Sequence, residues 1–171
     1  MRLPLFALLG TLLLSLQAHA GVGLRSIEIH EPTTGTTMPA MVFYPSTDAT
    51  PATQVGPYKV DAAFAAAPSP DRHPLVLLSH GHAGSSLGHH PLAVSLANAG
   101  YIVAAVEHAG DSYRDQSGFG TERVLYGRAW QVSSLLDALL ADSRFGALID
   151  PERIGVAGFS AGGYTSLLLL G

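Results

Sequence analysis

The sequence predicts an α/β fold, in which a mostly parallel β-sheet carries helices on both of its faces. Short apolar runs without polar alternation recur from residue 75 onward, and such runs are typical of strands buried on both sides. Segments with apolar residues at helical spacing separate these runs. Strands that alternate with helices in this way form parallel sheets with right-handed crossovers. The 171-residue chain is long enough for one such domain.

Two strands are expected ahead of the parallel part of the sheet. Residues 24–30 alternate apolar and polar side chains, and residues 40–44 form a second run that stops at Pro45. Turn residues between the two runs predict an antiparallel pair. Residues 45–74 are rich in Pro, Ala, Thr and Ser, which predicts a surface loop with room for one helical turn over 62–67. A loop of this length is a candidate lid or pocket wall.

The alternating elements begin at the apolar run 75–78, which predicts the first buried strand. A helix is predicted over 91–99, and Gly100 closes it because glycine readily adopts the left-handed conformation that follows a helix. Residues 101–106 predict the next buried strand, and a polar loop over 107–120 follows it.

A long helix is predicted over 121–141, with Thr121 as its cap and Glu122 in its first turn. Five apolar residues at helical spacing form its buried stripe, namely Val132, Leu135, Leu136, Leu139 and Leu140. Residues 153–159 predict the last strand, and a helix starts at Ala161.

The composition excludes several classes of function. Apolar residues make up 47% of the chain and charged residues 13%, the net charge is −4, and no run of Lys or Arg is present. Nucleic acids and anionic membrane surfaces are bound by clustered positive charge, so neither is an expected partner. Because the chain has no cysteine, a thiol nucleophile, a disulfide and a cysteine-based zinc site are excluded.

The first 20 residues have the organisation of a secretory signal peptide. Arg2 precedes an apolar stretch over residues 3–16, and Ala18 and Ala20 are small residues at the positions that a signal peptidase reads. We expect cleavage after about Ala20, a mature domain over 21–171, and a secreted or periplasmic location. The apolar stretch is shorter than the roughly 20 residues of a membrane-spanning helix, so no membrane span is expected after cleavage.

The segment Gly158-Phe159-Ser160-Ala161-Gly162 joins the last predicted strand to the last predicted helix. A sharp turn at this point exposes a serine hydroxyl at the mouth of a pocket, and Gly158 and Gly162 remove side chains that would clash in it. The amides at the start of the following helix favour developing negative charge. These features predict that Ser160 is the nucleophile of a serine hydrolase.

Acyl transfer by a serine also requires hydrogen-bond donors for the tetrahedral oxyanion. The amide of Ala161, which follows the nucleophile, is one candidate donor. The other is expected in the loop Ser79-His80-Gly81-His82-Ala83-Gly84, directly after the first buried strand. We assign it to the amide of His82, with Gly81 allowing a close approach of the backbone.

These motifs resemble those of the α/β-hydrolase superfamily, and more narrowly those of the branch that contains dienelactone hydrolase and platelet-activating factor acetylhydrolase. The resemblance extends over residues 24–171. It rests on four segments: Tyr44-Pro45, Leu77-Leu78-Ser79-His80-Gly81, Val106-Glu107-His108, and the stretch from Asp150 to Gly163 around Ser160. It implies the N-terminal part of an α/β-hydrolase domain, ending in the helix after the nucleophile turn.

In this superfamily the acid and the histidine of the catalytic triad follow the nucleophile along the chain. Only 11 residues follow Ser160, so we expect both partners to be missing and this chain alone to be inactive. An alternative is that His82 or His108 serves as the base, oriented by Asp111; otherwise His108 and Asp111 line the pocket or bond its loops. A metal site formed by the histidine pairs 80/82 and 89/90 is a further alternative. No acidic residue lies at a spacing typical of a metal ligand, so no metal is expected.

The combined features predict a serine hydrolase of carboxylic esters or lactones that works through an acyl-serine intermediate, with a small-molecule ester as its partner. This chemistry needs no metal or organic cofactor. An amidase or serine peptidase of the same fold uses the same nucleophile turn and stays open as an alternative. A non-catalytic fragment or binding protein is the second alternative.

Overall fold

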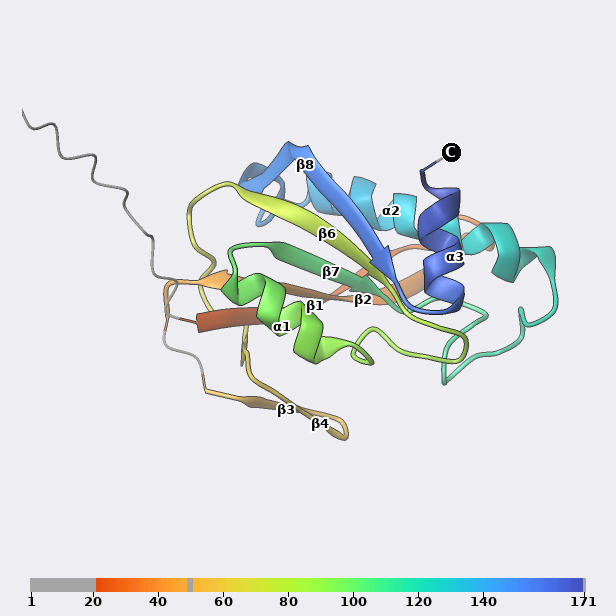
Figure 1. The fold of residues 1–171 in the computed structure, drawn as a ribbon, viewed down its shortest axis with the longest axis horizontal. Coiled ribbons are helices and arrows are strands. Elements are labelled where there is room, and N and C mark those ends of the chain that lie inside the picture. The colour runs from red at the N-terminus through yellow and green to blue at the C-terminus, as the bar shows by residue number, and fades with distance from the viewer. Residues whose placement is uncertain (1–20, 49–50, 171) are drawn as a thin grey trace, which may run out of the picture.

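A six-stranded mixed sheet forms the centre of the protein in the computed structural model, which describes residues 21–48 and 51–170 (Figure 1). The strands follow the spatial order β5-β1-β2-β7-β6-β8. Their bounds are Gly21–His30 for β1, Thr37–Ser46 for β2, Ala63–Phe64 for β5, His73–Ser79 for β6, Ile102–Val106 for β7 and Ile149–Gly158 for β8. Two short strands, β3 (Thr53–Val55) and β4 (Tyr58–Val60), form a separate hairpin. The predicted signal peptide over 1–20 lies outside the described residues.

The carboxyl ends of three parallel strands meet at one edge of the sheet. β6 pairs in parallel with both β7 and β8, and Ser79 at its end lies opposite Val106 and Gly158. The three segments that leave these strands therefore start side by side. β2 runs antiparallel to its neighbours β1 and β7, as the sequence predicts for the N-terminal pair, and β5 is parallel to β1.

Helices cover both faces of the sheet, which confirms the prediction. α1 (His90–Asn98) packs on one face, and α2 (Arg128–Ala141) and α3 (Ala161–Leu168) pack on the other (Figure 1). Gly100 follows α1 with φ +94, as expected of a glycine that ends a helix. Two short helical turns, η1 (Arg123–Gly127) and η2 (Gly146–Leu148), flank α2. In the described ranges no helix has the length and apolar character needed to cross a membrane.

The helical turn predicted over 62–67 is wrong, because β5 lies there. The amide of Ala65 donates to the carbonyl of Leu24 at 2.8 Å, so the segment hydrogen-bonds to the outer edge of β1. An exposed edge offers unpaired backbone groups, and pairing with it outweighs the weak helix preference of a short alanine-rich segment. β2 also continues through Pro45 to Ser46 instead of stopping there.

The long helix starts later than predicted, because a π-helical turn precedes α2. The hydroxyl of Thr121 donates to the carbonyl of Gly118 at 2.5 Å and caps no helix. The fully buried members of the predicted stripe are Val132, Leu135 and Leu139. Leu140 is 40% exposed, because neighbouring helical residues project about 100° apart and Leu139 is the one that faces the sheet.

Candidate active site

Ser160 occupies a strained turn between β8 and α3. Its backbone angles are φ 53° and ψ −116°, a left-handed conformation that residues other than glycine rarely adopt. A Cβ atom on Gly158 would overlap the carbonyl of Gly162, and one on Gly162 would overlap the carbonyl of Ser79. Both glycines are therefore required by close backbone approach, as the sequence predicts. The hydroxyl-bearing residue itself is exposed.

The start of α3 is closed by short backbone hydrogen bonds around the serine. The amide of Gly162 donates to Phe159 at 2.8 Å, and that of Gly163 donates to Ser160 at 2.9 Å. The amide of Ala161 has no acceptor in the described part of the chain, as is usual for the first residue of a helix. It is thus free to donate to an oxyanion, although its assignment to that role stays a prediction.

A β-turn after β6 lies against the nucleophile. The amide of Gly84 donates to the carbonyl of Gly81 at 3.1 Å, and Ala83 has φ +53°, the arrangement of a type II turn. A Cβ built on Gly81 would be 3.4 Å from Cβ of Ser160, so this turn and the nucleophile turn are in contact. His82 occupies the first central position of this turn. The oxyanion role predicted for its amide likewise stays a prediction.

Asp111 accepts hydrogen bonds from the turn at residues 81–84. One of its carboxylate oxygens accepts a hydrogen bond from the amide of Ala83 at 3.2 Å and a short one from Nδ1 of His82. The other oxygen receives Nη1 of Arg128 at 2.6 Å. Asp111 is completely buried, so it acts on the site through His82 and the turn and does not line an open pocket.

Arg128 connects three elements beneath the site. Its Nη2 atom donates to the carbonyl of His80 and to the hydroxyl of Ser79, the latter at 3.2 Å. Its Nε atom donates to the hydroxyl of Thr165 on α3 at 3.1 Å. Burial lowers the pKa of the guanidinium, and the charge and hydrogen bond of Asp111 oppose that shift. One side chain of α2 therefore fixes both the end of β6 and the helix that carries the nucleophile.

His108 is a buried neutral histidine with both ring nitrogens in use. The amide nitrogen of Gln131 donates to Glu31 at 2.9 Å, so the oxygen of Gln131 accepts from Nδ1 of His108 at 2.8 Å. Nε2 then accepts from the hydroxyl of Ser79 at 2.7 Å. Burial, followed by the charge of Arg128, lowers the pKa of His108 well below its usual value.

His80 is engaged in the same way. Its Nε2 accepts from the backbone amide of His108 at 3.0 Å, which leaves Nδ1 to donate to the carbonyl of Gly81 at 2.7 Å. Burial lowers the pKa of His80 to about 4. For Glu31 at the far end of this network, burial alone would raise the pKa. Hydrogen bonds from nearby hydroxyls and from Gln131 outweigh that effect and lower the pKa of Glu31 to about 2.

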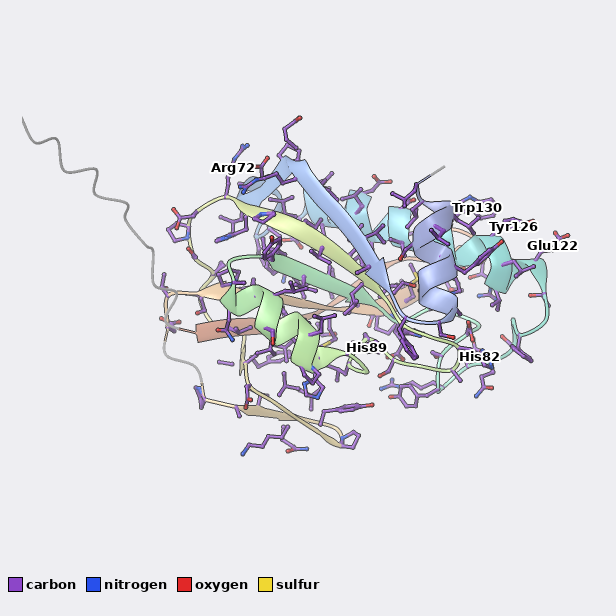
Figure 2. The ribbon with its side chains drawn as sticks, viewed as in Figure 1. Arg72, His82, His89, Glu122, Tyr126 and Trp130 are labelled. Atoms are coloured by element: carbon purple, nitrogen blue, oxygen red, sulfur yellow. The ribbon has the colours of Figure 1, made fainter. Side chains whose placement is uncertain are left out.

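These contacts separate the two upstream histidines that the sequence suggests as bases. His108 is committed to its buried partners and does not pair with Asp111. His82 does pair with Asp111, stacks on the ring of Phe119 at 4.2 Å, and has a side chain that is 38% exposed. Figure 2 shows it at the end of the sheet where α3 begins. Among the described residues, no histidine hydrogen-bonds to the hydroxyl of Ser160.

The histidine pairs do not assemble a metal site in the part of the chain that is described, since no group of three or more His, Asp or Glu side chains there is placed to hold an ion. His89 instead packs against the ring of Phe159, with 5.4 Å between ring centroids.

Sequence reasoning missed the residues that support the site, and Arg128 and Gln131 are the most important of them. Both lie on the face of α2 that carries Val132, Leu135 and Leu139, and both are buried. A charged and an amide side chain in register with an apolar stripe indicate a buried polar network, because such groups are buried only when paired.

The family model described as platelet-activating factor acetylhydrolase, isoform II, matches residues 33–124, just over half of the chain. The chain belongs to this family of α/β-hydrolases. The platelet-activating factor acetylhydrolase family match covers the turn at 81–84 and Asp111, and a model of the prolyl oligopeptidase family matches residues 90–171, which include Ser160. No curated protein matches the chain.

Solved structures support the same fold. A ferulic acid esterase from Streptomyces cinnamoneus superposes with a TM-score of 0.77 and 22% identity, over 90% of this chain and 56% of that one. The esterase Est22 gives a TM-score of 0.58 and 19% identity, over 88% and 38%. A dienelactone hydrolase-like promiscuous phosphotriesterase from metagenomic libraries gives 0.58 and 18%, over 87% and 54%. The present chain thus spans little more than half of the length of the ferulic acid esterase.

Proposed function

We propose that the whole protein is a serine hydrolase of carboxylic esters or lactones, exported to the periplasm or secreted. The observation that carries this proposal is the strained, exposed Ser160 at the end of β8, in contact with the glycine turn at 81–84. An ordinary connection would not hold a serine at positive φ against two glycines that tolerate no side chain.

In the proposed reaction Oγ of Ser160 attacks the ester carbonyl and gives its proton to a histidine base. The carbonyl oxygen becomes an oxyanion that accepts hydrogen bonds from the amides of His82 and Ala161. Collapse of this intermediate releases the alcohol with the transferred proton and leaves an acyl-serine. Water then attacks the acyl-serine with the same base, which releases the acid and regenerates Ser160.

Two similarities support ester chemistry over other uses of the fold. The family match is to an acetylhydrolase, and the similar structures include two esterases. The match of residues 90–171 to the prolyl oligopeptidase family favours a peptidase as the second candidate. A panel of p-nitrophenyl esters and peptide anilides separates the two, and faster turnover of the anilides would contradict the ester assignment.

The nucleophile is tested with a fluorophosphonate probe, which phosphonylates only an activated serine. We expect Ser160→Ala to abolish labelling of the active protein. Ser133→Ala should leave labelling unchanged, because Ser133 is an exposed residue of α2 whose hydroxyl donates to the carbonyl of Ala129 in its own helix. Labelling that persists in Ser160→Ala would contradict the proposal. The expectation that residues 1–171 by themselves label weakly or not at all is checked on the same gel.

The same probe decides between a downstream base and His82. If His82 with Asp111 activates Ser160, both His82→Ala and Asp111→Asn abolish labelling of the 171-residue chain. If the base lies elsewhere in the whole protein, His82→Ala in the whole protein retains most of the labelling of Ser160, because the backbone amide at position 82 is kept.

A further inference from the structure

Four completely buried polar side chains form one chain of hydrogen bonds from the turn after β1 to the end of β6. They are Glu31, Gln131, His108 and Ser79. The amide nitrogen of Gln131 donates to Glu31 at 2.9 Å, and Nδ1 of His108 donates to the oxygen of Gln131 at 2.8 Å. The hydroxyl of Ser79 then donates to Nε2 of His108 at 2.7 Å. Residues far apart in the sequence are therefore connected by side chains alone.

Glu31 sets the direction of these hydrogen bonds. Burial raises its pKa, but hydrogen bonds from two threonine hydroxyls and from Gln131 outweigh burial and lower that pKa to about 2. The carboxylate therefore only accepts, and Gln131 must turn its amide nitrogen toward it. The same nitrogen donates to the carbonyl of Ala109 at 3.2 Å, which also only accepts. The amide oxygen is left to face His108, and only a histidine protonated on Nδ1 donates to it.

The other end of the chain selects the same tautomer of His108. Nη2 of Arg128 donates to the hydroxyl oxygen of Ser79 at 3.2 Å. If Nε2 of His108 carried the proton, Nε2 and Nη2 would both donate to this oxygen. The serine proton would then have no acceptor in the described part of the chain. A buried hydroxyl without an acceptor is destabilising, so both ends favour the Nδ1-protonated ring.

Ser79 is the point at which these hydrogen bonds reach the nucleophile turn. Its carbonyl accepts from the amide of Phe159, the residue before Ser160, at 3.2 Å. The same carbonyl is the group that a Cβ atom on Gly162 would overlap, so the end of β6 and the start of α3 are in tight contact. A shift of Ser79 therefore moves the residues on both sides of Ser160.

We propose that Gln131 is a positioning residue of the hydrolase, which holds His108 in its Nδ1-protonated form and, through Ser79, keeps the turn of Ser160 in the geometry required for attack. Gln131 lies behind His108 and acts only through it. A misplacement of about 1 Å lowers the rate of an enzymatic reaction by as much as about 100-fold. The effect on turnover rests on the proposed function, whereas the tautomer of His108 does not.

The tautomer is tested by long-range ¹H–¹⁵N NMR spectra of the ¹⁵N-labelled 171-residue chain, because protonated and unprotonated ring nitrogens have different chemical shifts. The signals of His108 are identified by their loss in His108→Gln. At neutral pH we expect Nδ1 to be protonated and Nε2 unprotonated. Gln131→Met removes the acceptor of Nδ1, so the Nε2-protonated form should appear. Protonation of Nε2 in the parent chain, or a spectrum that Gln131→Met leaves unchanged, would overturn the proposal.

Steady-state hydrolysis of p-nitrophenyl acetate by the whole protein separates positioning from substrate binding. We expect Gln131→Met to lower kcat by about tenfold and to leave KM within about twofold, the pattern of a loss confined to the transition state. Gln54→Met is the matched control, since the exposed side chain of Gln54 bonds only to the carbonyl of Gly56 in its own hairpin. The control should change neither constant.

An exchange of the two groups, Glu31→Gln together with Gln131→Glu, separates positioning from a general loss of stability. The new amide at position 31 donates to the new carboxylate at position 131, which still accepts from Nδ1 of His108. We expect this double variant to keep the tautomer and to recover most of kcat. Gln131→Glu alone should stay impaired, because it places two carboxylates against each other.

A double variant with the parent tautomer and a kcat as low as that of Gln131→Met would overturn the positioning role, and so would a parent kcat in Gln131→Met. Failure of the proposed function is recognised separately, because the parent whole protein would then not be labelled by the fluorophosphonate probe. The NMR result on His108 does not depend on that labelling.

Discussion

Arg128 and Asp111 form an almost completely buried ion pair, with 2.6 Å between Nη1 and Oδ2, directly beneath the turn that carries His82. The other oxygen of Asp111 accepts a hydrogen bond from the amide of Ala83, and Nε of Arg128 donates to the hydroxyl of Thr165. The pair thus fixes the two turns of the site from inside the protein.

Replacement of Arg128 by methionine is expected to destabilise the protein by about 3–5 kcal/mol, because it leaves the carboxylate of Asp111 buried without its counter-ion. Urea denaturation measures the loss. The matched control is Arg153→Met, which breaks the exposed pair of Arg153 and Asp150, also 2.6 Å apart. Exposed pairs contribute at most about 1 kcal/mol, so equal losses in the two variants would contradict the structural role of Arg128.

Gly162→Ala is expected to destabilise the protein by about 1–3 kcal/mol or more, because its new Cβ atom would overlap the carbonyl of Ser79 and push β6 from α3. Gly155→Ala is the control, since a Cβ at Gly155 on β8 meets no atom within 4 Å. Thermal denaturation should show a lowered melting temperature for the first variant only. A melting temperature unchanged by Gly162→Ala would mean that the start of α3 and the end of β6 are not in tight contact.

The parts of the site that sequence patterns predict are those specified by neighbouring residues. The nucleophile turn requires Gly158 and Gly162 within four positions, and the turn at 81–84 follows a buried strand directly. The supporting network is different, because Gln131 bonds to Glu31 across 100 positions of sequence. No local pattern encodes such a partner.

The same reasoning explains the misassigned segment at 62–67. Its alanines favour a helix locally, but the outer edge of β1, about 40 residues earlier, provides backbone partners that a local pattern does not include. The positions of β6 and β7 were predictable because each contains a continuous apolar run, which is typical of a buried parallel strand. β8 was predictable only over its second half, because its first half contains the charged residues Asp150, Glu152 and Arg153.

Stability is expected to fall as the pH is lowered from about 6.5 towards 4. In that range the unfolded chain binds a proton at His80, whereas the folded protein does not, because burial lowers the pKa of His80 to about 4. The loss is about 1.4 kcal/mol per pH unit for each such histidine, and His108 adds to it in the same direction. Urea unfolding at pH 7, 6 and 5 measures the slope. His80→Gln should reduce it by about one proton, and an unchanged slope would show that His80 is not the group responsible.

Self-association is expected through the face formed by α3 and the outer edge of β8, which is an edge strand among the described residues. Leu167 on α3 is 66% exposed, and Tyr126 and Trp130 lie exposed nearby (Figure 2). Exposed apolar surface beside an unpaired edge promotes aggregation. Leu167→Lys should raise the monomer fraction in light scattering at a given concentration. Leu92→Lys, at a 48% exposed position on α1, is the control, and an equal effect there would contradict the assignment of this face.

The strain at Ser160 is expected to cost stability in exchange for an exposed hydroxyl. A non-glycine residue at φ 53° and ψ −116° carries about 1–3 kcal/mol of strain, which glycine avoids. Glycine also makes the unfolded chain more flexible, which offsets up to about 1 kcal/mol of that gain. We therefore expect Ser160→Gly to be about 1 kcal/mol more stable than Ser160→Ala in urea denaturation. Both variants lack the hydroxyl, which makes no capping hydrogen bond to α3, so their difference isolates the backbone. If Ser160→Gly is no more stable than Ser160→Ala, the turn holds no strain that depends on a side chain at this position.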